Sequence, residues 1–475
     1  MTPPSTTVAP ASAPGTEPIR IAVVGHTNAG KTSLLRTLSR RVDFGEVSDR
    51  PGTTRHVESI DLRADGRAAV RFFDTPGIED AVALQEHLHL PSAAPADASP
   101  AERVRRFLAG PEAHGVFEQE AKVLRTLLGA DAAFLVIDVR APVLPKYRAE
   151  VALLHACARP VLPALNFVRD GAGREADWRA LLADAGLHAV VRFDATAPFT
   201  GAERELYQDL GTLLPAHRAT LQRVVQALGA EADARREAAH HEVASLLVRC
   251  TALRRNVPDA SAAAVQSAAE ALQAEVRQAA QHCIDALLAL YGFRAGDADE
   301  APLPHLEGRW QMDLFSPEAL KAAGLRLGAG TAAGAAVGVV ADIALAGLSL
   351  GAGAALGGAI GGAVSQGWGP LGRKVWNRAR GVRELTVDDA ALALLVRWQQ
   401  LLLQALEQRG HADPQRLQAI SPPPDETAAG SATAAMRAAR PARSHPDWAA
   451  PRSADPARQA LVAAVSRILS ARPPG

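Results

Sequence analysis

Eight residues near the N-terminus, Gly25-His-Thr-Asn-Ala-Gly-Lys-Thr32, have the types and spacing needed to bind phosphate groups. Gly25 and Gly30 let the backbone curl, so that successive N–H groups point at phosphate oxygens. Lys31 would bring its charge to the β- and γ-phosphates, and the Thr32 hydroxyl would be a ligand of Mg²⁺. The nucleotide-binding residues predicted in this loop are Gly25, Asn28, Ala29, Gly30, Lys31, Thr32 and Ser33.

The segments on either side of this loop are those that such a loop requires. The apolar run Ile19–Val24 predicts a buried strand, and the pattern from Ser33 to Arg40 predicts a helix. A helix that starts at the phosphates directs its positive end toward them. Strand, GxxxxGKT loop and helix in this order predict a P-loop, rather than a Gly-rich turn that matches the pattern by chance.

Two further motifs follow at the spacing of a nucleotide-dependent switch. Pro51-Gly-Thr-Thr-Arg55 lies about twenty residues past the P-loop, and Asp74-Thr-Pro-Gly77 ends the apolar run Ala69–Phe73. In GTPases a switch threonine and a strand-end aspartate complete the Mg²⁺ shell, while a glycine N–H senses the γ-phosphate. Each motif alone is typical of an ordinary turn or strand end, but the three motifs together indicate a GTPase.

GxxNxGKT, PGTTR and DTPG resemble the Era/TrmE branch of bacterial P-loop GTPases, in the translation-factor-like class, over roughly residues 19–80. Three later stretches, Asp131–Arg140, Pro142–Tyr147 and Val161–Asn166, are similar to a smaller group. Its members are bacterial GTPases fused to a C-terminal helical domain of unassigned function. That second resemblance brings no known activity with it.

The first resemblance implies roles for individual residues. Thr54 and Asp74 would join Thr32 as ligands of Mg²⁺. Lys31, Thr54 and Gly77 would act on the γ-phosphoryl group, because they correspond to the charged residue and the two switch contacts of the branch. GTP, GDP and Mg²⁺ are therefore the expected ligands.

Asn28 stands at the P-loop position where potassium-activated members of this branch carry an asparagine that helps to hold K⁺. The ion then neutralises charge between the β- and γ-phosphates, as an arginine finger does elsewhere. The alternative is that Asn28 is present because it tolerates a left-handed turn conformation.

Two positions depart from the patterns of well-known GTPases. Ile78 follows DTPG where Ras-like enzymes carry the glutamine that positions water, so intrinsic turnover should be slow. Glu79, Asp80 and Glu86 are nearby candidates for that role, and the alternative for each is a solvated acid on a mobile switch.

The second departure concerns the residues that would read the base. Guanine readers present Asn-Lys-x-Asp after the fifth strand, whereas the run Pro160–Leu165 leads here into Asn166-Phe-Val-Arg-Asp170. Asn166 is in place, Arg169 occupies the aspartate position, and Asp170 comes one residue late. Asp170 could read guanine only if the loop bulges, so a weakened preference for guanine is expected. The last base-contacting loop should fall at residues 194–197.

Alternating strand and helix patterns predict an α/β domain in which a mostly parallel sheet lies between helical layers. The domain should be followed by a helical one, because apolar residues then recur at helical spacing. The predicted organisation is a disordered tail at 1–18, the P-loop GTPase domain at 19–215, a helical C-terminal domain at 216–410, and a largely disordered tail at 411–475 with a short amphipathic helix at 456–471.

Residues 324–372 are rich in Gly and Ala. Leu327–Ala341 and Ile343–Gly372 carry no charge, and Asp342 alone separates them. Each arm has glycines spaced by four, which places them on one face of a helix, as in a Gly-zipper hairpin. These glycines are Gly330, Gly334 and Gly338, and Gly353, Gly357 and Gly361.

Basic residues at both ends of this apolar hairpin fit a segment that enters a membrane and returns to the cytoplasmic face. The arms of 15 and 30 residues compare with the ~20 residues of a full span. Contact with inner-membrane lipid through 324–383 is therefore predicted. The alternatives are a tightly packed helical hairpin in a soluble core and a flexible linker.

The composition limits the partners and the compartment. The 475 residues carry no net charge and have a pI of about 7.3, so a broad nucleic-acid footprint is not expected. The three cysteines have no metal or disulfide spacing, and the polar N-terminal tail has no apolar h-region. We expect a cytoplasmic protein, either free or held at the cytoplasmic face of the inner membrane.

The sequence thus predicts a GTP-binding protein that slowly hydrolyses GTP to GDP and reports its nucleotide state to a membrane-associated helical domain and an unidentified protein partner. The alternative is a soluble nucleotide-dependent scaffold or assembly factor with little or no turnover. A third interpretation, a ribosome-assembly GTPase, requires salt-sensitive RNA binding, and the neutral charge balance disfavours it.

Overall fold

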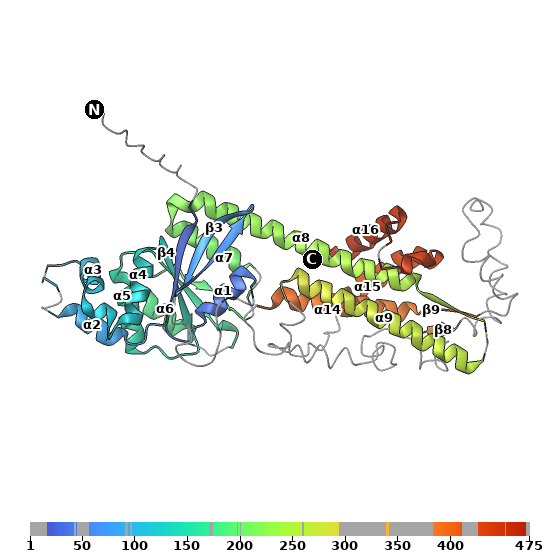
Figure 1. Ribbon diagram of the computed structural model, residues 1–475, viewed down its shortest axis with the longest axis horizontal. Coiled ribbons are helices and arrows are strands. Elements are labelled where there is room, and N and C mark those ends of the chain that lie inside the picture. The colour runs from blue at the N-terminus through green and yellow to red at the C-terminus, as the bar shows by residue number, and fades with distance from the viewer. Residues whose placement is uncertain are drawn as a thin grey trace, which may run out of the picture. The chain divides into compact units, whose positions relative to one another are not determined.

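The computed structural model (Figure 1) describes the chain in two compact units. Residues 1–232 with 408–414 make up the first unit, and residues 233–407 with 415–475 make up the second. The described residues are 17–41, 44, 57–90, 94–95, 97–170, 174–196, 198–199, 201–258, 261–293, 339–341, 383–410, 426–451 and 453–471.

The first unit contains a six-stranded sheet in the order β2-β3-β1-β4-β5-β6. The strands are β1 (Ile19–Val24), β2 (Glu58–Ala64), β3 (Arg67–Asp74), β4 (Ala132–Asp138), β5 (Val161–Asn166) and β6 (Val191–Arg192). Neighbouring strands are parallel except for β2, which pairs antiparallel with β3. The predicted α/β fold with a mostly parallel sheet is confirmed.

Helices cover both faces of this sheet, and each layer has its own apolar core. One core involves α1 (Lys31–Ser39), α7 (Ala202–Leu213) and the start of α8 (Arg218–Ala252). The other involves α2 (Ala81–His89), α3 (Pro100–Ala109), α4 (Glu118–Leu128), α5 (Pro145–Ala156) and α6 (Glu175–Asp184). The central strands read as continuous apolar runs because both of their faces are buried.

Short 3₁₀ turns connect some of these elements, namely η1 (Pro111–His114), η2 (Val168–Asp170) and η3 (Pro215–His217). Of these, η2 follows β5 directly. It therefore lies at the carboxyl end of the sheet, where ligands bind in open α/β folds.

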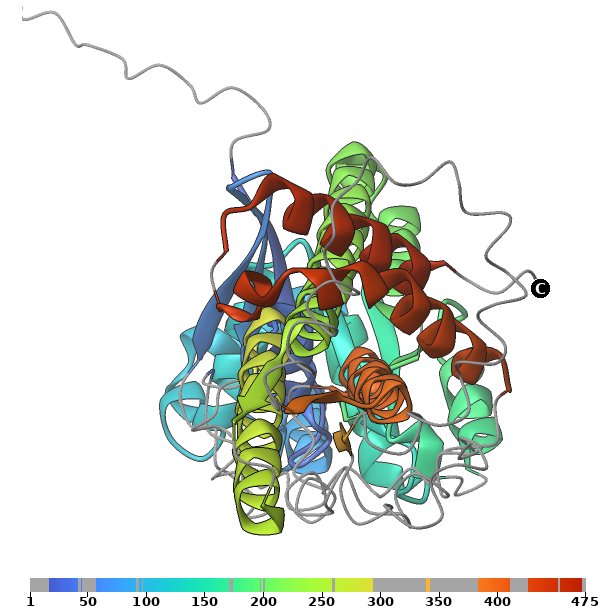
Figure 2. The same cartoon turned by 90° about the vertical axis from the view of Figure 1, so that its right-hand side faces the viewer.

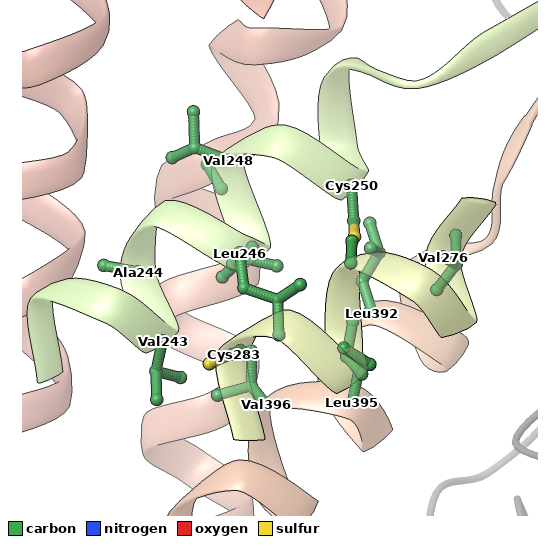
Figure 3. Packing of buried hydrophobic residues seen from close by; sticks show 14 of the residues in the cluster. Val243, Ala244, Leu246, Val248, Cys250, Val276, Cys283, Leu392, Leu395 and Val396 are labelled. Carbon is green, nitrogen blue, oxygen red and sulfur yellow. The ribbon is translucent and has the colours of Figure 1, made fainter. Parts of the chain in front are cut away.

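The second unit is mainly helical. Its elements are the rest of α8, β7 (Arg254–Val257), α9 (Ala262–Leu290), β8 (Val339–Ala341), β9 (Arg383–Val387), α14 (Asp389–Gln408), α15 (Glu426–Ala439), η4 (Arg440–Ser444), η5 (Pro446–Ala449) and α16 (Pro456–Ser470). Side chains from α8, α9 and α14 meet in one apolar core. Figure 3 shows members of that core, including Val243, Leu246, Cys250, Val276, Cys283, Leu392 and Val396.

A three-stranded antiparallel sheet, β7-β9-β8, belongs to the helical unit. Its strand β8 lies within the apolar segment predicted as a helical hairpin, so that prediction is wrong for Val339–Ala341. Two adjacent β-branched residues, Val339 and Val340, favour a strand, and Leu385–Val387 supply the partner backbone. The rest of 324–372 lies outside the described residues.

The predicted disordered tail also needs correction. Residues 426–470 contain α15, α16 and two 3₁₀ turns, and Figure 2 shows the two helices side by side. Met436, Trp448, Val462 and Val465 from this region are buried in the core of the helical unit. An Ala- and Pro-rich composition suggested disorder, but these apolar side chains stabilise the helices by packing.

Within the parts of the chain described above, no helix is both long enough and apolar enough to cross a bilayer.

Candidate functional site

The predicted phosphate-binding loop joins β1 to α1 and has the backbone of a phosphate cradle. Gly25 has a φ of 142° and Gly30 a φ of 92°, in the region that glycine favours. A Cβ atom at Gly25 would collide with the carbonyl of Val136, and one at Gly30 would collide with Nδ2 of Asn166. Both positions therefore require glycine. Ala29 is buried inside the loop, and Ser33 is half-buried in the first turn of α1.

Asn28 has a φ of 63°, in the left-handed region. Asparagine is one of the residues that tolerate this conformation best. The left-handed conformation is therefore enough to explain an asparagine at position 28, as the alternative to a potassium site proposes. Potassium binding at Asn28 stays a prediction.

Lys31 is buried beneath the loop, and its Nζ donates to the carbonyl oxygens of Gly25 and His26, each at 3.0 Å. Burial lowers the pKa of Lys31, and the carboxylates of Asp74 and Glu150 oppose that shift. The ammonium group of Lys31, the first residue of α1, is therefore held by two carbonyl oxygens of the loop.

Thr32 and Asp74 meet at the point where a metal ion is expected. The hydroxyl of Thr32 donates to Oδ2 of Asp74 at 2.6 Å, and both side chains are buried. The other carboxylate oxygen, Oδ1, has no hydrogen-bond partner in the part of the chain that the structure describes. Burial raises the pKa of Asp74 to about 6, despite the lowering effects of Thr32 and Lys31. A hydroxyl and an orphaned carboxylate oxygen are hard donors that fit Mg²⁺.

The DTPG motif is held close to the P-loop. Thr75 donates its hydroxyl to the carbonyl of Val23 at 2.7 Å, which ties the end of β3 to β1. A Cβ atom at Gly77 would collide with Thr27, so only glycine permits this approach. The backbones of His26 and Ile78 also form an isolated parallel bridge. Thr54, the predicted switch ligand of Mg²⁺, lies outside the described residues.

Asn166, at the end of β5, connects the loops that would surround a base. Its Nδ2 donates to the carbonyl of Ala29 at 2.9 Å, and its Oδ1 accepts from the N–H of Phe167 and the N–H of Ala195. The side chain is fully buried. Asn166 therefore links the P-loop to the loop after β6, in the region where the last base-contacting loop was predicted.

The rest of the base loop differs from an Asn-Lys-x-Asp reader. Arg169 turns its guanidinium toward the Phe199 ring, 4.7 Å from its centroid, and donates to the carbonyl of Pro198. Asp194 accepts from the N–H of Arg169 at 3.2 Å, so a carboxylate of the last loop ties the two loops together. The backbone of Asp170 ends η2, and its side chain lies outside what the structure describes.

The structure shows where Ile78 and the three acidic residues near it lie. Ile78 is 1% exposed and apolar, so it cannot orient water. Asp80 caps α2 by accepting from the N–H of Ala83. Glu86 is exposed on α2. The backbone N–H of Glu79 donates a hydrogen bond to Glu120, which is described in the next paragraph.

Glu120 is a buried residue that the sequence analysis did not single out. Its Oε1 accepts from the N–H groups of Glu79 and Asp80, at 3.1 and 3.0 Å. It therefore pins the segment between Gly77 and α2, the part that should respond to a γ-phosphate. In the sequence, the feature that comes closest to indicating this role is a charged residue on the apolar face of α4.

Comparison with known protein families gives two matches. Residues 20–166 match the model described as "50S ribosome-binding GTPase", and residues 179–470 match "Domain of unknown function (DUF3482)". The first match covers the P-loop, DTPG and Asn166, and shows a GTPase domain. The second covers more than half of the chain and includes all of the helical unit's described elements.

Individual relatives match short parts of the chain. The chain is 49% identical over 61 residues to the tRNA modification GTPase MnmE of Agrobacterium fabrum, which is 13% of either protein. It is 43% identical over 82 residues to GTPase Der of Desulforudis audaxviator, or 16% of this chain and 17% of Der. It is 44% identical over 62 residues to a probable GTP-binding protein EngB of Anaeromyxobacter, 12% of this chain and 29% of EngB. The chain thus spans less than a third of the length of these relatives.

Two solved structures are similar to the chain at low identity. One is Era in complex with MgGDPNP and a 16S ribosomal RNA fragment, with 22% identity, coverage of 37% of this chain and 50% of that one, and a TM-score of 0.26. The other is a probable GTP-binding protein engB, with 15% identity, coverage of 41% and 98%, and a TM-score of 0.26.

Proposed function

The chain belongs to the family defined by the domain of unknown function DUF3482, and because a GTPase domain precedes that domain we propose that it is a slow GTPase switch. The observation that carries this proposal is the buried pair of Thr32 and Asp74 directly under the P-loop, with one carboxylate oxygen unpartnered. An arrangement of this kind serves a nucleotide that arrives with Mg²⁺.

The chain's own residues have separate tasks in this proposal. Backbone N–H groups from Gly25 to Lys31 surround the phosphates, and Lys31 exchanges its carbonyl partners for β- and γ-phosphate oxygens. Thr32 and Asp74, with Thr54, hold Mg²⁺, which supplies charge neutralisation at those oxygens. Gly77 approaches Thr27 of the P-loop closely. In this proposal its N–H senses the γ-phosphate.

Hydrolysis should be slow because Ile78 follows Gly77 at the position where Ras-like enzymes carry the water-positioning glutamine. Ile78 is apolar and buried, and Asp80 is a helix cap. A water-positioning group must therefore come from a partner or from a rearrangement of the switch. Potassium binding near Asn28 remains a prediction. The comparison of turnover in K⁺ and in Na⁺ buffer, described at the end of this subsection, tests it.

Guanine remains the preferred base in this proposal, with a weakened preference. This is supported by the hydrogen bonds of Asn166 to Ala29 and Ala195, whereas Arg169 faces the Phe199 ring. Asp170 would then supply the carboxylate that pairs with guanine N1–H and the 2-amino group.

The signal should pass to the helical unit, since the family is defined by that region. The name of one relative refers to tRNA modification, and the description of the family matched by residues 20–166 refers to ribosome binding. A chain without net charge gives no support for RNA as the partner. We favour a protein partner, with membrane lipid contact through 324–383 as a separate proposal.

The membrane proposal rests on the uncharged composition of 343–372 and its basic flanks. Full-length protein and a variant lacking 342–372, which keeps β8 and β9, should differ in flotation with anionic liposomes. Equal flotation would contradict lipid contact through this segment and favour the scaffold that stays in solution.

The experiment for the main proposal is nucleotide turnover by the full chain, with GTP and ATP compared in K⁺ and in Na⁺ buffer. Slow, GTP-selective, Mg²⁺-dependent turnover is the expected result. Tight GTP binding without turnover would instead favour the scaffold alternative. Absence of both binding and turnover would contradict the proposal.

A further inference from the structure

A buried acidic side chain lies behind the phosphate-binding loop and has no task in the function proposed above. Glu150 of α5 is 3% exposed, and its Oε1 has no hydrogen-bond partner in the described parts of the chain. Its Oε2 lies 3.9 Å from Nδ1 of His26, the second residue of the P-loop. A buried carboxylate is costly unless a nearby cation or several donors compensate for lost water. The surroundings of Glu150 must therefore supply that compensation.

His26 does not supply the compensating charge. Its Nε2 lies 2.8 Å from Nζ of Lys146. A lysine ammonium group can only donate, so Nε2 accepts and the ring proton is on Nδ1, on the side of Glu150. Burial lowers the pKa of His26, and the charges of Lys146 and Lys31 lower it further. The imidazole is therefore neutral, and the Tyr147 ring packs edge-on against it.

The remaining cations near Glu150 are Lys31 and Lys146. Lys31 donates to the carbonyl of His26 at 3.0 Å, while Glu150 approaches the ring of the same residue. The lysine of the P-loop and the carboxylate of α5 therefore both lie close to His26. Burial raises the pKa of Glu150 to about 7, and the charges of Lys31 and Lys146, in that order, oppose the rise.

We propose that Glu150 is the internal counter-ion of Lys31 in the nucleotide-free protein, and that its negative charge limits the affinity of the P-loop for nucleotide. This inference rests on the proposed function, because it assumes that nucleotide phosphates bind at Lys31. Phosphates bring several negative charges to the lysine and replace Glu150 as its partner. The carboxylate then repels them across an interior that screens charge poorly. Glu150 acts through Lys31 and His26 and touches no phosphate itself.

The proposal predicts the direction of a mutational effect. Glu150→Gln keeps the shape of the side chain and removes its charge, so affinity for GTP and GDP should rise about ten-fold at pH 8, or about 1.4 kcal/mol. Glu150→Asp keeps the charge and should keep the wild-type affinity within about three-fold. A side chain that only packs behind the loop predicts the opposite order, because a shorter residue leaves a void and an isosteric one does not.

The effect should also depend on pH. The charged and titratable groups that face this carboxylate are Lys31, His26, Lys146 and Tyr147, with Asp74 on the far side of Lys31. Glu150 is charged above about pH 7 and neutral well below it. The affinity ratio of Glu150→Gln to wild type should therefore be near one at pH 5.5 and grow above pH 7. The nucleotide's own titration cancels because both proteins are compared at each pH.

The test is calorimetric binding of Mg²⁺-GDP and Mg²⁺-GTP to the full chain and its variants at about pH 5.5, 7 and 8.5. Glu175→Gln is the matched control, since it removes one carboxylate that pairs with Arg179 and Arg192 at the surface of the same unit. It should leave the affinity unchanged.

Each outcome bears on one claim. Tighter binding by Glu150→Gln, growing with pH, supports the counter-ion role. Unchanged or weaker binding by Glu150→Gln, when wild type binds nucleotide, overturns it and leaves the proposed function standing. If wild type does not bind nucleotide, the proposed function itself fails. Should Glu150→Gln melt well below wild type, the affinity of Glu150→Asp for GDP at pH 8.5 decides the question. An affinity within about three-fold of wild type supports the inference, and a larger fall overturns it.

Discussion

The hydroxyl of Thr32 donates a 2.6 Å hydrogen bond to Oδ2 of Asp74, although 42 positions separate the two residues. The contact exists because β1 and β3 are adjacent parallel strands, so their carboxyl ends meet beside the P-loop. It uses one oxygen of the carboxylate and leaves Oδ1 buried without a partner among the described residues. A metal ion with its nucleotide would satisfy that oxygen.

The first prediction concerns Asp74. Asp74→Asn keeps the hydrogen bond from Thr32 but removes the charge that Mg²⁺ requires. We expect the gain in GTP affinity on adding Mg²⁺ to fall about a hundred-fold, since even indirect damage to a metal site costs 10- to 100-fold. GTP affinity measured with Mg²⁺ and with EDTA gives this gain. Asp61→Asn, which removes a carboxylate that pairs with Arg71, is the control. An unchanged Mg²⁺ effect in Asp74→Asn would rule out this metal site.

The second prediction concerns Glu120, whose carboxylate holds two N–H groups at the start of α2. Glu120→Ala removes the acceptor of both N–H groups, and the loss of two hydrogen bonds should destabilise the switch segment by about 1–3 kcal/mol. Hydrogen exchange at residues 79–90 should therefore accelerate. Glu118→Ala, which breaks an exposed pair with Lys122 on the same helix, should have little effect. Equal exchange in the two variants would show that Glu120 does not hold the segment.

The third prediction concerns selection of the base. If Asp170 reads guanine from a bulged loop, then Asp170→Ala should lower the ratio of GTP to ATP affinity about ten-fold, or about 1.4 kcal/mol. Asp177→Ala, on the exposed face of α6, should leave the ratio unchanged. Competition of GTP and ATP for a fluorescent GDP analogue measures both. A ratio unaffected by Asp170→Ala would assign base selection to another residue.

The fourth prediction is a pH dependence of stability in the nucleotide-free protein. Burial raises the pKa of Glu150 to about 7 in the folded state, well above its value of about 4.3 in an unfolded chain. The folded state therefore holds this proton more tightly, and the resulting stability is complete below about pH 4.3 and is lost as pH rises through 7. Asp74, with a raised pKa of about 6, has the same sign.

Wild-type protein should thus lose more thermal stability than Glu150→Gln between about pH 5 and pH 8. The contribution of Asp74 remains in both proteins, so the difference between the two curves reports on Glu150. Melting temperatures measured across this range give the comparison. Parallel curves would mean that Glu150 titrates as an ordinary exposed glutamate does.

Local patterns predicted much of the GTPase fold because its central strands β1, β4 and β5 are almost wholly buried and its loops need particular residues. The run Ile19–Val24 is β1, and the glycines at 25 and 30 are required by backbone geometry. The places of Glu120 and Glu150 could not be predicted, because each depends on which helix packs behind a loop distant in sequence. A single charged residue on a helix gives no sign of that packing.

The same reasoning explains the errors in the helical unit. Glycine spacing in the segment 324–372 suggested helices, yet Val339–Ala341 pair with β9, more than 40 residues further along the chain. Alanine-rich residues after 425 suggested disorder, but Met436 and Trp448 are buried against other helices. In both places a long-range partner decides the structure, and composition alone does not reveal it.

Mg²⁺-dependent GTP binding and turnover by the full chain, compared with Lys31→Ala, is the most decisive test of the proposed P-loop. Lys31 is the only cation placed to replace its carbonyl partners by phosphate oxygens among the described residues of the P-loop. Wild type should bind GTP in preference to ATP and hydrolyse it slowly, whereas Lys31→Ala should lose nucleotide affinity. Tight GTP binding that survives Lys31→Ala would contradict the P-loop assignment and with it the proposed switch.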